Sequence, residues 1–149
     1  MNRSLLIVED DLDQLDALTR WFTRAGCRVT AAHHPRQALA AATLHPFQVA
    51  LVNHALPEID GIELTRQLRA LLHDVQVIVL SDEADAVPKA KAAGAVACLI
   101  KPCKKALLEA TVEDVFERCA DETQLHAATR SACTYLKRPT KGTEFAKSR

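Results

Sequence analysis

The stretch Val49–Gly61, which reads VALVNHALPEIDG, decides the fold and contains the side chain that decides the chemistry. An apolar run ends at one polar residue, Asn53, and a Leu-Pro pair, Asp60-Gly61 and a helical pattern follow it. This order predicts a buried strand, a loop, and a helix with Asp60 as its N-cap. Reactive groups in sheets of this kind lie at the carboxyl ends of the strands. Asn53 is therefore a candidate site residue, and it carries an amide.

Short apolar runs alternate with helical patterns along most of the chain. Gly26 ends the first helical pattern, Pro35 begins the second, Pro88 predicts a late start for the fourth, and Pro102 predicts the start of the fifth. Five strands that alternate with five helices indicate a parallel sheet with helices on both faces. Strands are predicted at residues 5–8, 28–31, 49–52, 75–80 and 97–100, and the second and third helices at 36–44 and 62–72.

The last helical pattern is long, because no Gly or Pro occurs from Cys103 to Arg138. A second apolar stripe begins at Leu125 in a shifted phase, so we expect a helix with a break around residues 121–123. From Thr129 onward there are six Lys or Arg against one Glu, and a flexible end is expected from Pro139. The predicted organisation is one domain over residues 1–120, followed by a helical extension and basic tail over residues 121–149.

Composition excludes several classes of protein. The 149 residues contain 19 Lys plus Arg and 19 Asp plus Glu, so the formal net charge is zero. No strong electrostatic field therefore favours a membrane or nucleic acid as the main partner. No apolar run approaches the roughly 18 residues that span a bilayer, and we expect no secretory signal. An odd number of cysteines without a C-x-x-C pair is typical of reduced thiols in a cytoplasmic protein. The five cysteines are Cys27, Cys98, Cys103, Cys119 and Cys133.

Four of the predicted strands end at polar or charged groups that a core does not need. Glu9-Asp10-Asp11 follow the first strand, Asn53 the third, Ser81-Asp82 the fourth, and Lys101 the fifth. Clustered carboxylates suit a hard cation, and a hydroxyl with an ammonium suits a phosphoryl group. Each group alone is an ordinary solvated loop residue, but all of them at the same edge of one sheet indicate a single site.

With these groups in this order, the chain resembles the receiver domain of two-component response regulators. The resemblance covers about residues 4–120 and implies a flavodoxin-like (βα)5 doubly wound α/β fold with strand order 2-1-3-4-5. The motifs that carry it are Leu6–Asp11, Asn53-x-x-Leu56-Pro57-x-x-Asp60-Gly61, Val79-Leu80-Ser81, Ala93-Gly94-Ala95 and Lys101-Pro102.

The resemblance also implies roles for individual residues. Glu9 and Asp10 match the acidic pair that binds Mg²⁺, and Ala55 matches the position whose backbone carbonyl ligates the same ion. Ser81 matches the hydroxyl that hydrogen-bonds the phosphoryl group. Lys101 matches the lysine of the phosphoryl pocket, and the peptide bond that follows it is usually cis in this family.

Three positions depart from the family pattern. Asn53 stands where the phosphoacceptor aspartate is expected, and a neutral amide cannot form the acyl phosphate. It also removes a negative charge, so Mg²⁺ should bind weakly or not at all. Asp82 replaces a small residue and should repel an incoming phosphoryl anion, and Cys98 replaces an aromatic ring that reports activation. The phosphoacceptor position (Asn53), the position that controls access to it (Asp82) and the position that reports activation (Cys98) thus all differ from the family pattern.

We therefore expect a non-enzymatic pseudo-receiver that acts without phosphorylation, through contact with a histidine kinase or an output protein. The predicted contact surface comprises the fourth helix, fifth strand and fifth helix. Two alternatives stay open. Asn53 can be an engineered Asp-to-Asn exchange in a conventional phosphoaccepting regulator. The chain can also be the amino-terminal receiver of a DNA-binding regulator, with residues 121–149 as a linker and its shifted stripe as a homodimer seam.

The remaining candidates have ordinary interpretations. Strand alternation points His54 away from Asn53, which argues against His54 as a second acceptor. His33, His34 and His45 lack compact metal-ligand spacing. Cys98 and Cys103 are expected to be a core thiol and a helix-surface thiol.

Overall fold

A computed structural model describes residues 3–128, and side-chain burial as far as residue 120. Five parallel strands form one sheet in the order β2-β1-β3-β4-β5, which confirms the flavodoxin-like fold. The elements are β1 (Ser4–Val8), α1 (Leu12–Arg24), β2 (Arg28–Ala32), α2 (Pro35–Leu44), β3 (Val49–Asn53), α3 (Gly61–Leu71), β4 (Gln76–Ser81), α4 (Ala86–Ala92), β5 (Ala97–Ile100) and α5 (Lys105–Ala128).

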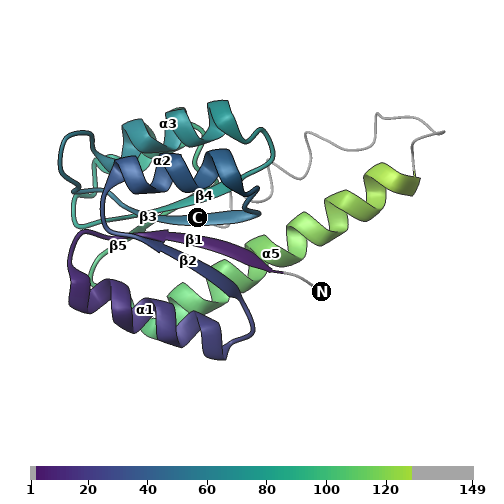
Figure 1. Cartoon of the computed structure of the whole chain (residues 1–149), viewed down its shortest axis with the longest axis horizontal. Helices are drawn as coiled ribbons and strands as arrows, with labels where there is room; N and C mark the ends of the chain where they lie inside the picture. The colour runs from purple at the N-terminus through teal and green to yellow at the C-terminus, as the bar shows by residue number, and fades with distance from the viewer. Residues whose placement is uncertain (1–2, 129–149) are drawn as a thin grey trace. The chain divides into compact units, whose positions relative to one another are not determined.

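Helices cover both faces of the sheet, which explains why the central strands are continuously apolar. Helices α2 and α3 lie over one face, and α1 and the first part of α5 lie over the other (Figure 1). Leu6 and Val8 of β1 belong to the core under α2, α3 and α4, together with Leu64 and Leu68 of α3. Because neighbouring strand residues point to opposite faces, the residues between them face α1 and α5.

The chain divides into two compact units, Met1–Phe116 and Glu117–Arg149. The first contains the whole sheet, and of the second the structure describes the helical residues up to Ala128. The domain boundary expected after residue 120 stays a prediction. The side chains of the predicted second stripe and all of the basic tail lie outside the described part of the chain.

Three predictions about helix ends are wrong. Helix α4 begins at Ala86, so Pro88 lies within its first turn, where a missing N–H costs nothing, and does not delay the start. Helix α5 begins at Lys105, because Pro102 belongs to the turn after β5. The break expected around residues 121–123 is absent, since α5 is continuous to Ala128 and these residues include no Gly or Pro.

Other boundaries agree with the sequence to within about one residue. The cis peptide bond between Lys101 and Pro102 is present. Asp60 is the N-cap of α3, and its side chain accepts a hydrogen bond from the Glu63 N–H at 2.9 Å. Strand β4 begins one residue later than expected and ends with Ser81. Within residues 3–128, none of the helices is both long and apolar enough to span a bilayer.

Candidate functional site

Asn53 ends β3 and is only 6% exposed, and both polar atoms of its side chain are hydrogen-bonded. The Lys101 ammonium donates to Oδ1 at 2.6 Å. The amide Nδ2 donates to the backbone carbonyl of Ala55 at 2.9 Å. An ammonium can only donate and a carbonyl can only accept, so this network fixes the orientation of the amide.

Glu9 lies beside the same lysine at the end of β1. It is 3% exposed, and its carboxylate accepts from the Asp11 N–H at 3.1 Å and lies 3.9 Å from Lys101 Nζ. Burial raises the pKa of Glu9, as does Asp10, whereas the Asp11 N–H and Lys101 lower it. We call Glu9, Asn53, Ala55 and Lys101 the amide network. Its ammonium lies between an amide oxygen and a buried carboxylate.

The residues that the resemblance assigns to Mg²⁺ fit a divalent cation poorly in this arrangement. The Ala55 carbonyl faces an N–H donor from Asn53, where a metal site needs another oxygen ligand. Asp10 is exposed, and Glu9 is already paired with an N–H and an ammonium. Among the described residues, no group of three or more His, Cys, Asp and Glu is arranged to hold a metal. The roles of Glu9, Asp10 and Ala55 as ligands stay predictions.

Ser81 lies in a second hydrogen-bond network. Ser81 is 1% exposed, and its hydroxyl lies 2.8 Å from His54 Nδ1 and accepts from the Glu83 N–H at 3.0 Å. The other ring nitrogen of His54 lies 3.8 Å from the Asp60 carboxylate. We call His54, Asp60 and Ser81 the hydroxyl network. Its serine contacts a histidine of this chain at the position where the resemblance predicts contact with a phosphoryl group.

The register of the sheet explains why the two networks are separate. Asn53 pairs with Leu80, and the His54 N–H donates to the Leu80 carbonyl at 2.8 Å. His54 therefore reaches the level of Ser81, one residue further along. Because alternate residues point to opposite faces, Asn53 and His54 contact different groups.

Gly61 closes the loop against the end of β3. Its N–H donates to the His54 carbonyl at 2.7 Å, and an added Cβ would lie 2.2 Å from the Asn53 carbonyl oxygen. Only glycine permits this approach of two backbones. The Asp60-Gly61 pair of the motif therefore combines a helix cap with a contact that fixes both networks.

Glu58, within the same loop, has a positive φ of 71°, which is strained for a residue with a Cβ. Its carboxylate accepts from Arg36 at 2.8 Å and lies 3.4 Å from His34 Nε2. His34 also caps α2 through Nδ1. These contacts fasten the loop to the start of α2.

The other candidate residues lie around the networks. Asp82 is exposed directly after Ser81, and its predicted effect on access stays a prediction. Cys98 is buried in β5 beside Val79, and burial raises the pKa of its thiol. Asp11 caps α1 by accepting from two N–H groups of its first turn. Sequence reasoning missed the contact between His54 and Ser81, which depends on the register of β3 against β4.

Residues 5–113 match the family described as the response regulator receiver domain, and the chain belongs to this family. It is 33% identical over 116 residues to the transcriptional regulatory protein PrrA of Mycobacterium tuberculosis, covering 76% of this chain and 50% of that protein. It is 28% identical over 104 residues to sporulation initiation phosphotransferase F of Bacillus subtilis, covering 68% of this chain and 84% of the relative. The chain thus spans about half the length of the PrrA relatives it matches.

A solved structure supports the same assignment. A response regulator protein from Burkholderia pseudomallei, with a phosphorylated aspartic acid, a calcium ion and citrate, matches with a TM-score of 0.70 and 27% identity. The match covers 81% of this chain and 73% of that one. The chain is therefore a receiver domain of two-component signalling, with an asparagine at the end of β3.

Proposed function

We propose that this receiver domain signals without phosphorylation of residue 53, by contact with a protein partner of a two-component pathway. The observation that carries the proposal is the amide of Asn53, whose two polar atoms are both bonded within the protein. An amide nitrogen is a far weaker nucleophile than an ionised carboxylate, and here it donates a hydrogen bond to the Ala55 carbonyl.

The amide network also supports a pocket that is stable without a metal ion. An aspartate at position 53 would place a carboxylate oxygen near the Ala55 carbonyl, and a cation would be needed between these two acceptors. Asn53 supplies an N–H to that carbonyl instead. Asp82 and Cys98, the two other departures from the family pattern, agree with a site that has lost the reaction.

The partner we propose is a histidine kinase or an output protein, at the surface made by α4, β5 and α5. Large apolar side chains on this surface support the choice. Ile100 of β5 is 37% exposed, and Leu107 of α5 is 50% exposed. Exposed apolar side chains of this size are available to a protein partner.

The proposal predicts that acetyl phosphate with Mg²⁺ leaves the intact mass of the protein unchanged. Asn53→Asp restores the nucleophile, but we expect slow phosphorylation because Asp82 repels the anion. Asn53→Asp with Asp82→Ala should accept the phosphoryl group faster, by about tenfold for one removed charge near the site. Asp82→Ala alone is the matched control and should stay unmodified. Intact-mass spectrometry over time measures all four proteins.

Two outcomes would count against the proposal. A phosphoryl adduct on the unchanged protein would show that the domain is phosphorylated after all. Rapid phosphorylation of Asn53→Asp alone, independent of Asp82, would favour a conventional regulator with an exchanged acceptor.

A second candidate is the amino-terminal receiver of a longer, DNA-binding regulator. The observation that favours it is the length of PrrA, a transcriptional regulatory protein of which this chain covers half. Under this candidate residues 121–149 form a linker and a dimer seam. Sedimentation as a monomer at high concentration would contradict the seam.

A further inference from the structure

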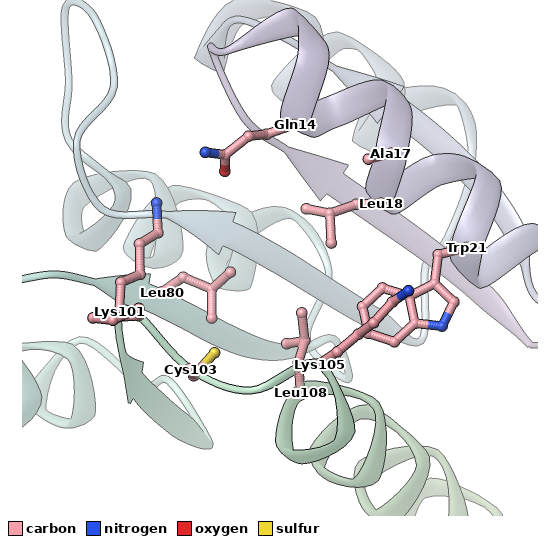
Figure 2. Close-up of a pocket in the computed structure, with 10 residues that line it drawn as sticks. Gln14, Ala17, Leu18, Trp21, Leu80, Lys101, Cys103, Lys105 and Leu108 are labelled. Carbon is pink, nitrogen blue, oxygen red and sulfur yellow. The ribbon is translucent and has the colours of Figure 1, made fainter.

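A groove of about 440 Å³ lies beside the amide network, between α1, the turn after β5 and the start of α5. Figure 2 shows Leu18 and Trp21 reaching into it from α1, with Leu80 from β4 and Leu108 from α5 opposite them. These four side chains give the groove apolar walls. Its volume falls within the range of about 300–1,000 Å³ that is usual for small-molecule sites.

The polar groups of the groove are cationic or neutral. Lys101, Lys105 and Gln14 line it, and no Asp or Glu does so within the described part of the chain. Lys101 is engaged with Asn53 and lies near Glu9. The Lys105 ammonium lies 4.3 Å from the centre of the Trp21 ring and has no ion pair with a side chain of residues 3–120, the part whose side chains are described. Lys105 is thus a cation available to an incoming anion.

We infer that this groove binds a small aromatic carboxylate. The flat apolar body would pack against the Trp21 indole and the leucine walls, since aromatic pairs add to the free energy of area burial. The carboxylate would meet the Lys105 ammonium in a charge-assisted hydrogen bond. The absence of acidic lining within the described residues favours an anion over a cation of the same shape.

The groove communicates with the amide network through one side chain. The Lys101 side chain lines the groove (Figure 2), and its ammonium donates a hydrogen bond to Asn53 Oδ1. Packing of the ligand against the Lys101 side chain would link the groove to residue 53 without a phosphoryl group. Binding of a ligand in the groove does not depend on whether residue 53 accepts a phosphoryl group. This inference can therefore fail while the proposed function stands, and the proposed function can fail while this inference stands.

The test adds 2-naphthoate, as the probe, to the full chain. Calorimetry measures the binding, and the NMR signal of the Trp21 indole N–H reports where it occurs. Trp21 is the single tryptophan of the sequence, so its signal needs no assignment. We expect saturable binding and a shift of this signal. Lys105→Gln should weaken binding by about tenfold, the loss of one charge-assisted contact. Ala17→Phe, an exposed position on the groove, should abolish binding by filling it.

Matched controls separate charge from shape. Lys104→Gln removes an exposed lysine next to Lys105 that does not line the groove, and it should bind as the unchanged protein does. The neutral 2-naphthamide should bind more weakly than 2-naphthoate, and acetate should not move the Trp21 signal. Equal affinity for naphthoate and naphthamide, an unaffected Lys105→Gln variant, or no saturable shift up to the solubility limit would overturn the inference.

Discussion

Asn53 and His54 are adjacent in the chain, but they belong to networks on opposite faces of the sheet. The amide network joins Asn53 to Lys101, Ala55 and Glu9, whereas the hydroxyl network joins His54 to Ser81 and Asp60. The family resemblance assigns Lys101 and Ser81 to one phosphoryl group. In this structure each of them bonds a different side chain of the protein, so a phosphoryl group would have to displace partners on both faces.

The two networks also differ in charge. The amide network contains a buried carboxylate and an ammonium, and its bond from Lys101 to Asn53 is charge-assisted, which makes it the stronger kind. The bond between Ser81 and His54 joins two groups that need not be charged, and such bonds contribute about 1 kcal/mol net. We therefore expect the hydrogen bonds of the amide network to be harder to break than those of the hydroxyl network.

Gly61→Ala should have the largest effect, because it disturbs both networks at once. The new Cβ would lie 2.2 Å from the Asn53 carbonyl oxygen, and the Gly61 N–H holds the His54 carbonyl. We expect a loss of about 3 kcal/mol in the free energy of unfolding, as for a severe overpacking. Urea denaturation measures it.

Gly26→Ala is the matched control. Gly26 has a φ of 100° and no neighbour within 4 Å of an added Cβ, so it carries the cost of backbone conformation without the collision. That cost is about 1 kcal/mol. Equal losses in the two variants would mean that the approach of Gly61 to β3 does not constrain the site.

A double-mutant cycle of Ser81→Ala and His54→Phe tests the separation of the networks. We expect a coupling free energy of about 1 kcal/mol between the two positions, from the loss of one hydrogen bond. The side-chain NH₂ signals of Asn53 should stay in place in every variant, because its partners are on the other face. A shift of these signals in Ser81→Ala would show that the two networks communicate.

Sequence reasoning predicted most of the fold because the strands are buried on both faces and read as continuous apolar runs. The candidate positions followed from strand ends, since parallel strands bring their carboxyl ends to one edge. Strand alternation placed His54 away from Asn53, but the contact between Ser81 and His54 did not follow. It depends on the register of β3 against β4, which pairs Asn53 with Leu80, and a residue pattern does not specify register.

The misplaced helix starts have a related cause. One rule, that proline belongs near a helix start, applies to both Pro88 and Pro102, but the two residues lie in different places. Pro88 lies inside the first turn of α4, and Pro102 lies in the turn before α5. Proline fixes one φ angle and removes one N–H, so it limits where a helix begins without specifying the residue. Tertiary packing decides between the permitted starts.

Glu9→Gln is the smallest of these effects and the most specific to the amide network. Burial raises the pKa of Glu9 above its ordinary value of 4.5. At pH values between 4.5 and this raised pKa, the folded protein therefore binds more protons than the unfolded chain does. The stability of the unchanged protein therefore falls as pH rises through that interval, while the neutral amide of the variant adds no such dependence. Lys101 and the Asp11 N–H oppose the burial cost, which keeps the effect small.

In metal-free buffer, Glu9→Gln should thus gain stability relative to the unchanged protein between about pH 4 and about pH 7. Urea denaturation at both pH values measures the gain, and Glu109→Gln, an exposed carboxylate on α5, corrects for the loss of one charge. A relative loss on raising the pH would mean that attraction to Lys101 outweighs burial. In that case the amide network would hold the Glu9 carboxylate as an ion pair with Lys101.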